Sequence, residues 1–273
     1  MVDTAVQGQY ASVNGLEMYY EIHGEGQPLV MLHGAYMTIS GFGDLLPALA
    51  EDRQVIAVEL QGHGHTADVD RPITYEGMAD DVAALIRELG LREVDVYGFS
   101  MGGGVALQLA IRHPDLLRKL VVVSAGHTYD VMPADLAASF ETITPEMFAG
   151  TPFEAAYLEV APNPGDFPKL VEKLKQLDLT HFDWTEQVRG ITAPVLLIVG
   201  DSDIVQLEYA VELFKLLGGG VVGDMQPMPA SQLAILPATS HLGMMDRTSL
   251  LAPITKAFLD APMPEAADQP AAG

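Results

Sequence analysis

The sequence predicts an α/β fold built on a mostly parallel sheet, and three observations support that prediction. Short apolar runs, typical of strands buried on both faces, alternate with amphipathic helical patterns. Asn14-Gly15, a strong hairpin signal, precedes the first buried run and predicts an antiparallel pair at the start of the sheet. Strand-like runs are absent only between 125 and 190. We therefore expect an α/β core domain over 1–124 and 191–260, a helical insertion over 125–190, and a disordered tail rich in Ala and Pro over 261–273.

The individual elements follow from periodicity and from turn signals. Eight segments have the pattern of strands: 10–13, 16–23, 28–32, 54–60, 94–97, 120–123, 194–200 and 232–236. Core helices are predicted over 42–50, 75–89, 101–113, 207–217 and 250–259, and short helices in the insertion over 134–140, 145–148, 152–160 and 167–177. This order predicts an eight-stranded, mostly parallel sheet with helices on both faces.

Composition narrows the class of protein. The chain has 273 residues, 49% of them apolar, no cysteine and a formal net charge of −23. Without cysteine there is no disulfide and no thiolate chemistry, and the negative charge disfavours nucleic acid and anionic membrane surfaces as partners. The first ten residues do not have the pattern of a signal peptide, and the longest apolar run, 194–199, is too short to cross a bilayer. We expect a soluble cytoplasmic protein.

The stretch from Val94 to Pro114 contains the pattern that indicates the function most directly. It reads as strand, sharp turn and helix, with Gly98-Phe99-Ser100-Met101-Gly102 at the turn. In this G-x-S-x-G context the serine occupies a strained backbone position, and its hydroxyl is presented at the carboxyl edge of the sheet above a helix N-terminus. We therefore predict that Ser100 is a nucleophile.

A serine hydroxyl needs a base, and the base needs a carboxylate that orients it. Of the four histidines after Ser100, only His241 follows the last predicted strand; the other three are His113, which ends the helix after the serine, His127 and His181. His241 is therefore the predicted base.

Candidate acids follow the neighbouring predicted strands. Asp201 and Asp203 both follow the strand over 194–200, and Asp203 lies further over the sheet edge. We favour Asp203, interpret Asp201 as hydrogen-bonded to its own turn, and keep Asp130 as a third candidate.

An acyl-transfer site also needs two N–H groups that stabilise the developing oxyanion. One is expected from Met101, the residue after the nucleophile, and the other from the loop after the first parallel strand. Ala35 is the expected donor in that loop, with Tyr36 as the alternative. His33, which precedes the serine and adjoins Gly34, is expected to order the loop.

The sequence resembles the α/β-hydrolase superfamily over residues 10–260. The resemblance rests on five motifs: VMLHGAY at 30–36, QGHGHT at 61–66, VYGFSMGGG at 96–104, LLIVGDSDIV at 196–205 and ATSHLGMMDR at 238–247. It implies the α/β-hydrolase fold, a small helical cap formed by the insertion, and Asp203 as the acid. One departure is the long Gly- and Pro-rich connection over 218–230, which suggests a role in assembly and hence a homo-oligomer.

The nucleophile limits the chemistry. Serine forms an acyl-enzyme, so a carboxylic ester or lactone is the expected substrate, and relatives that open epoxides use aspartate at the elbow. A C–C bond hydrolase, an enol-lactonase or a perhydrolase on the same triad remains open, as does a hydrolase-like small-molecule receptor. No cofactor or metal is expected, because the His63-Gly64-His65 pair fits the family's usual turn.

Apart from Arg247 at the end of the last motif, no arginine or lysine adjoins the motifs, so the expected partner is a small, uncharged and partly apolar ester. Its pocket is expected to be lined by apolar and aromatic side chains from the oxyanion loop, the insertion and the last loop: Tyr36, Met132, Phe140, Phe148, Tyr157, Trp184 and Met244.

Overall fold

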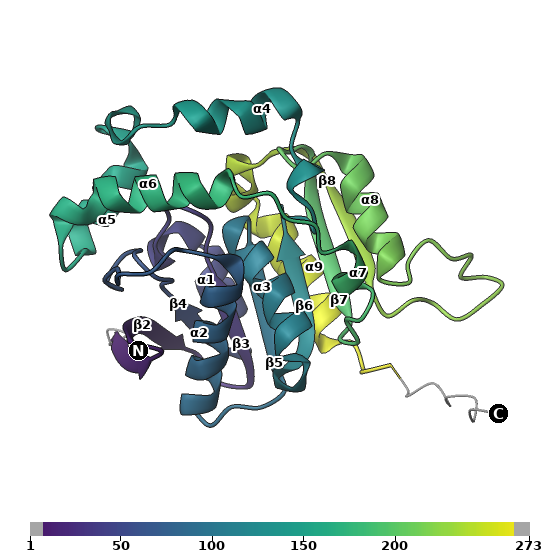
Figure 1. Cartoon of the computed structure of the whole chain (residues 1–273). Coiled ribbons are helices and arrows are strands. Elements are labelled where there is room, and N and C mark those ends of the chain that lie inside the picture. Colours follow the sequence, from purple (N-terminus) through teal and green to yellow (C-terminus); the bar gives the residue numbers. More distant parts are fainter. Residues whose placement is uncertain (1–7, 265–273) are drawn as a thin grey trace.

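An eight-stranded sheet forms the centre of the computed structural model, which describes residues 8–264 (Figure 1). The strands lie in the order β1-β2-β4-β3-β5-β6-β7-β8. Their bounds are β1 Gln9–Val13, β2 Leu16–His23, β3 Gln27–Leu32, β4 Arg53–Val58, β5 Val94–Phe99, β6 Leu117–Val123, β7 Val195–Ser202 and β8 Gln232–Ser240. The predicted fold class is confirmed.

Pairing directions place the functional loops at one edge. β1, β2 and β4 pair antiparallel, with the first turn at Asn14 and Gly15, both of which have positive φ. β4, β3 and the strands from β5 to β8 pair in parallel. The carboxyl ends of β3, β5, β6, β7 and β8 therefore meet at the same edge of the sheet, where an open α/β fold forms its ligand sites.

Helices cover both faces of the sheet. Their bounds are α1 Leu45–Leu49, α2 Tyr75–Glu88, α3 Met101–Arg112, α4 Ala134–Ser139, α5 Pro152–Val160, α6 Phe167–Asp178, α7 Thr185–Val188, α8 Leu207–Leu216 and α9 Thr248–Asp260. α1 and α9 pack together on one face, and α2, α3 and α8 share the core of the other. The apolar runs of the central strands are buried from both sides, as their sequence indicates.

The segment 125–190 is helical and contributes no strand to the sheet. Figure 1 shows α4, α5 and α6 lying across the carboxyl edge of the sheet. α6 carries a stripe of buried apolar side chains that belongs to the same core as α2 and α3: Phe167, Leu170, Val171, Leu174 and Leu177. These short helices are held by packing on the core, because isolated helices of this length are marginal in water.

The structure differs from the predicted elements at several places. The helix predicted over 42–50 is split, because Gly43 adopts a φ of 50° between a 3-10 turn at Ile39–Phe42 and α1. The last strand continues past its predicted end and includes Pro237. Proline has no N–H to donate, and β8 tolerates it because an edge strand has no partner strand on its outer side. The short helix α7 was not predicted, because four residues carry too little periodicity.

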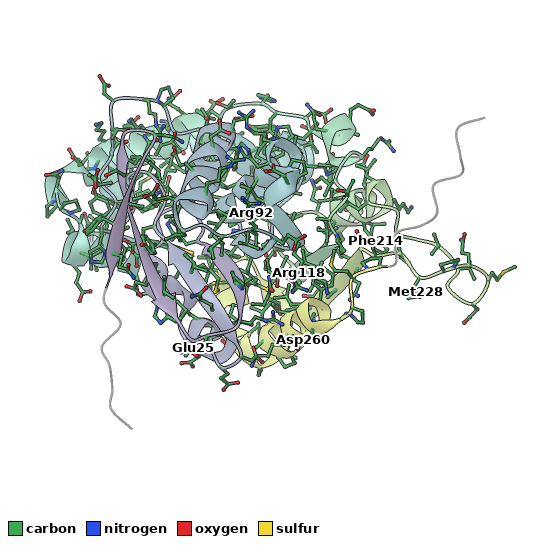
Figure 2. All side chains as sticks on the ribbon, turned by 90° about the horizontal axis from the view of Figure 1, so that it is seen from below. Glu25, Arg92, Arg118, Phe214, Met228 and Asp260 are labelled. Carbon is green, nitrogen blue, oxygen red and sulfur yellow. The ribbon has the colours of Figure 1, made fainter. Side chains whose placement is uncertain are left out.

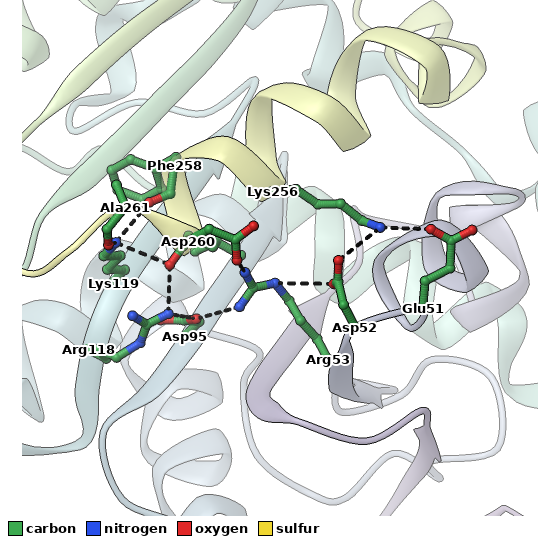
Figure 3. Close-up of polar contacts among 11 residues, drawn as sticks. Glu51, Asp52, Arg53, Asp95, Arg118, Lys119, Lys256, Phe258, Asp260 and Ala261 are labelled. Atoms are coloured by element: carbon green, nitrogen blue, oxygen red, sulfur yellow. Dashed lines mark hydrogen bonds and ion pairs between the residues drawn. The ribbon is translucent and has the colours of Figure 1, made fainter.

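A buried charge cluster holds α9 at the opposite, lower edge of the sheet (Figure 3). Asp95 is fully buried and accepts hydrogen bonds from Arg53 and Arg118. Lys119 Nζ donates to the carbonyls of Phe258 and Leu259 at the end of α9. Figure 2, viewed from below, places Arg118 and Asp260 within this lower surface. The cluster is far from the carboxyl edge, so we interpret it as structural.

The connection between α8 and β8 projects from the body and carries exposed apolar side chains, among them Val222, Met225 and Met228 (Figures 1 and 2). Its expected role in assembly stays a prediction. Of the predicted tail, 265–273 lie outside the described residues. Over 8–264, none of the helices has the length and apolarity needed to cross a membrane.

Candidate active site

Ser100 sits at the turn between β5 and α3 in a strained conformation. Its φ is 54° and its ψ is −119°, a backbone conformation that residues other than glycine rarely adopt. The backbone fixes it there, because Ser100 N–H donates to the carbonyl of Val123 on β6 and its own carbonyl accepts from Gly103 and Gly104. The side chain is consequently held out from the sheet edge.

Two glycines allow this turn to be so tight. A Cβ added to Gly98 would lie 2.2 Å from the carbonyl oxygen of Gly102, and one added to Gly102 would lie 2.2 Å from the carbonyl oxygen of Leu32. Both obstacles are backbone atoms, which cannot move aside. The G-x-S-x-G spacing is therefore a steric requirement of the turn.

A continuous hydrogen-bonded chain starts at the serine. Ser100 Oγ lies 2.9 Å from His241 Nε2, and His241 Nδ1 lies 2.7 Å from Asp203 Oδ1. His241 is supplied by the loop after β8 and Asp203 by the loop after β7, so three parallel strands deliver the three side chains to one edge. The ring of Phe99 packs on the imidazole, with the centroids 5.1 Å apart.

Asp203 is fully buried and surrounded by donors. Its Oδ2 accepts from Ser124 Oγ and from Gly200 N–H, and its Oδ1 also accepts from Ile204 N–H at 2.8 Å. Burial opposes ionisation, but these hydrogen bonds and the bond and charge of His241 outweigh it and lower the pKa of Asp203. The carboxylate is thus ionised at neutral pH and fixes Nδ1 of the imidazole as the protonated nitrogen.

The other two candidate acids lie elsewhere. Asp201 is exposed and accepts from the backbone N–H groups of Ala238 and Thr239, at 2.9 and 3.1 Å. Within its own turn Asp201 Oδ1 accepts from Ser202 Oγ at 3.2 Å, and its two backbone bonds join the end of β7 to the end of β8. Asp130 is also exposed, and the histidine that it would orient is already bonded to Asp203.

The loop after β3 lies beside the serine. Ala35, Tyr36 and Met101 all line the same cavity as Ser100. Tyr36 has a φ of 64°, and its N–H donates to His63 Nε2 at 3.3 Å. Among the hydrogen bonds of residues 8–264, neither Ala35 N–H nor Met101 N–H has an acceptor. These two amides are therefore free to meet a ligand, whereas that of Tyr36 is occupied.

Two buried histidines order this loop. His33 bonds through Nδ1 to the carbonyl of Gly34 and accepts at Nε2 from Leu60 N–H. His63 bonds through Nδ1 to the carbonyl of Gln61 and accepts from Tyr36. Burial lowers the pKa of His33 to about 4 and, together with the charge of His33, that of His63 to about 3. Both rings are neutral at neutral pH and hold backbone atoms.

A cavity of about 350 Å³ opens above Ser100 and His241, between the sheet edge and the helical segment 125–190. Four of the residues predicted to line a pocket do line it: Tyr36, Met132, Phe140 and Phe148. Tyr36 and Phe148 pack against each other, with their ring centroids 4.5 Å apart. Because one wall comes from the loop after β3 and the other from the segment 125–190, the cavity is shaped by both.

Three other predicted lining residues are corrected by the structure, since each is buried in a packed core behind the cavity wall. Trp184 stacks on Phe182, which itself lines the cavity. Tyr157 packs on Phe167, and Met244 is fully buried in the core on the opposite face of the sheet. The aromatic or apolar character of a residue in the sequence therefore does not distinguish a residue of the cavity wall from a residue of the packed core.

Several residues that line the cavity were not predicted from the sequence, and Asp178 is the one among them with a carboxyl side chain. It is the last residue of α6, one position past the predicted end of that helix. A signal was present, because Asp178 follows Val171 and Leu174 at spacings of seven and four and so continues their apolar stripe. Asp178 is half-buried, and a carboxylate at such a position requires explanation.

The comparisons with known proteins agree with this architecture. A sequence model of the alpha/beta hydrolase fold family matches residues 27–181. The soluble epoxide hydrolase of Corynebacterium sp. (strain C12) is 37% identical over 125 residues, which cover 45% of this chain and 43% of that protein. The pimeloyl-[acyl-carrier protein] methyl ester esterase of Nitrosospira multiformis is 25% identical over 256 residues, covering 83% of this chain and 92% of that protein.

A solved structure extends the likeness to nearly the whole chain. The enol-lactonase from Burkholderia xenovorans LB400 superposes with a TM-score of 0.71 at 22% identity, over 92% of this chain and 100% of that one. At this identity the likeness shows the fold. Several curated relatives of higher identity are matched over less than half of their own length. Since the family model matches more than half of the chain, the chain belongs to the α/β hydrolase fold family.

Proposed function

We propose that the protein is a serine hydrolase that cleaves a carboxylic ester or a lactone through an acyl-enzyme. The observation that carries the proposal is the hydrogen-bonded chain from Ser100 Oγ through His241 to buried, ionised Asp203, with Ser100 and His241 both lining a cavity of about 350 Å³. This arrangement has the nucleophile, base and orienting carboxylate that acyl transfer requires.

The geometry supports each step of acylation. His241 Nε2 accepts the proton of Ser100 as Oγ attacks the carbonyl carbon, and Asp203 stabilises the imidazolium that forms. The free N–H groups of Ala35 and Met101 are the proposed donors to the oxyanion. His241 then gives its proton to the departing alkoxide, and water repeats the sequence on the acyl-enzyme.

The elbow serine favours esters over epoxides, although an epoxide hydrolase is among the relatives. A carboxylate that opens an epoxide forms an ester, which an activated water can hydrolyse. A serine hydroxyl would form an ether, which the same base cannot cleave. An ester or lactone avoids this dead end, and one relative, matched over 92% of its length, is a pimeloyl-[acyl-carrier protein] methyl ester esterase.

We further propose that the segment 125–190 acts as a cap that shapes the substrate pocket. Its Met132, Phe140 and Phe148 line the cavity opposite Ser100. Apolar walls of this kind bind the acyl or alcohol chain of a small ester and exclude water from the reacting carbonyl.

Labelling with a serine-directed fluorophosphonate tests the nucleophile. We expect a single adduct, located by peptide mass spectrometry on the Ser100 peptide and absent in Ser100→Ala. Ser202→Ala, which changes an exposed serine near the same edge, is the matched control and should label normally. An adduct that persists in Ser100→Ala would refute the assignment.

Turnover of p-nitrophenyl esters and small lactones tests the reaction and distinguishes an enzyme from a hydrolase-like receptor. An enzyme releases many equivalents of p-nitrophenol per protein, whereas a receptor stops after one. A vinylogous diketone belongs in the same panel, because preferential cleavage of its C–C bond would replace the ester in this proposal.

A further inference from the structure

Asp178 brings a carboxyl group into the wall of an otherwise apolar and aromatic cavity. It ends α6 and lines the cavity together with Ser100 and His241. In the part of the chain that the structure describes, its carboxyl makes no hydrogen bond and no ion pair with a protein group. A carboxylate in such a place is costly unless something pairs with it.

The lysines of the same helix are engaged elsewhere. Lys169 and Lys173 pair with Asp68, and Lys175 donates to the carbonyl of Ile143. Lys175 is three residues before Asp178, a spacing at which two side chains of a helix can form an ion pair. No such pair is formed, because Lys175 contacts Ile143 instead. The C-terminal end of a helix also disfavours a negative charge, so α6 itself does not stabilise the carboxylate.

The surroundings favour a cation. Tyr36, Tyr75, Phe148 and Phe182 belong to the aromatic lining, and among the charged side chains only Asp178 and the proposed base line the cavity within residues 8–264. The hydroxyl of Tyr36 is buried without a hydrogen-bond partner among those residues. Burial and then the charge of Asp178 raise the pKa values of Tyr36 and Tyr75, so both rings lie within range of that charge.

We propose that Asp178 binds a protonated amine of the substrate, so that the substrate class is an ester or lactone carrying an ammonium group away from the scissile carbonyl. An ammonium would pair with the carboxylate and lie against aromatic faces, which attract cations. The inference rests on the proposed ester hydrolysis at Ser100, and it replaces the expectation of an uncharged substrate.

Other polar groups fit this wall less well. A substrate carboxylate would be repelled by ionised Asp178, and the described cavity offers no lysine or arginine to hold it. A hydroxyl needs only a neutral partner, which tyrosine and Thr128 already provide. An unpaired carboxylate in a cavity with an aromatic lining is explained by a cation that pairs with it.

Isosteric esters test the proposal on the acyl side. p-Nitrophenyl 6-aminohexanoate and p-nitrophenyl heptanoate differ by an ammonium in place of a methyl group. After division by the spontaneous hydrolysis rates, we expect kcat/KM at pH 8 to favour the amino ester about tenfold or more, the scale of a charge-assisted hydrogen bond. On the alcohol side, 6-aminohexyl butanoate and heptyl butanoate form the equivalent pair.

Variants at α6 assign the preference to Asp178. Asp178→Asn removes the charge at nearly constant volume and should reduce the amino-to-alkyl ratio about tenfold or more. Glu172→Gln makes the same charge change at an exposed position of the same helix and should leave the ratio unchanged. Equal loss in both variants would indicate a general effect of net charge and overturn the role of Asp178.

The pH dependence of the ratio gives a second readout. Burial raises the pKa of Asp178 to about 7, so the free carboxyl ionises between pH 6 and 8. The substrate ammonium remains charged throughout this range, because an alkyl amine has a pKa of about 10.4. Tyr36 and Tyr75, which line the same cavity, stay neutral because their pKa values are raised. The ratio should rise with pH in the wild type and stay flat in Asp178→Asn.

The outcomes separate the two proposals. Turnover of the alkyl esters with no preference for ammonium in either pair leaves the hydrolase and overturns the amine site. Preference for p-nitrophenyl hydrogen adipate below pH 7 would also overturn it, since Asp178 would then hold an acid.

If no ester is hydrolysed, the proposed function fails, and calorimetric titration decides the amine site by itself. Hexylammonium should bind Ser100→Ala more tightly than hexan-1-ol, and this difference should vanish when Asp178→Asn is added. Equal binding of the two ligands to Ser100→Ala would overturn the site.

Discussion

Replacing Asp203 by asparagine tests the identity of the acid most directly. Each carboxylate oxygen faces a backbone donor, Ile204 N–H on one side and Gly200 N–H on the other. The amide group of asparagine must therefore turn its NH₂ toward one of these N–H groups. Whichever orientation it adopts, one hydrogen bond is replaced by a contact between two donors.

The two orientations fix the size of the effect. With NH₂ toward His241, the imidazole must accept at Nδ1 and carry its proton on Nε2, where it cannot take the proton of Ser100; a fall in kcat on the order of 10⁴ is expected, about 5.4 kcal/mol. With the oxygen toward His241, the tautomer is kept but the negative charge is lost, which lowers kcat by about 10–100-fold.

Steady-state hydrolysis of a p-nitrophenyl ester measures the effect, with Asp201→Asn as the matched control. Asp201 is exposed, and among residues 8–264 its carboxylate bonds to the backbone and to Ser202, so its replacement should change kcat by less than about threefold. A fall of less than tenfold for Asp203→Asn, or a larger fall for Asp201→Asn or Asp130→Asn, would refute the assignment.

Three further predictions follow from the structure. Phe148→Ala should shift the preferred ester length, with discrimination between esters changing by about 1–3 kcal/mol per methylene-sized step. The measurement is kcat/KM across acyl chain lengths, and an unchanged profile would show that the segment 125–190 does not shape the pocket. Asp95→Ala should lower the free energy of unfolding in urea by about 3–5 kcal/mol, because Arg53 and Arg118 lose a buried partner, whereas Asp115→Ala at an exposed pair should lower it by less than about 1 kcal/mol. Since the folded state lowers the pKa of Asp203, its stabilising contribution is present above the ordinary aspartate pKa of about 3.9 and is lost as the pH falls through the folded value, so the unfolding free energies of wild type and Asp203→Asn should converge in acid.

Local patterns in the sequence were sufficient for the strands and for the tight turn that carries Ser100. Buried parallel strands are continuous apolar runs, and the turn at Ser100 requires glycine at 98 and 102 for steric reasons that act within a few residues. The position of His241 after the last strand also followed from chain order, because parallel strands end at one edge. These features depend on short-range geometry and on one topological rule.

Tertiary structure decided which similar residues serve which purpose. Asp201 and Asp203 are two positions apart, yet one joins two strand ends and the other lies buried under the imidazole. Ala35 and Tyr36 differ because His63, distant in sequence, occupies only the second amide.

The same holds for the pocket. Trp184 and Phe148 have equal aromatic character, and only the packing of the insertion on the sheet places Phe148 on the wall and Trp184 behind it. The role proposed for Asp178 depends on its place in the cavity wall and on the lysines of α6, which contact other residues. Such roles depend on contacts between segments far apart in the chain, which periodicity and spacing do not encode.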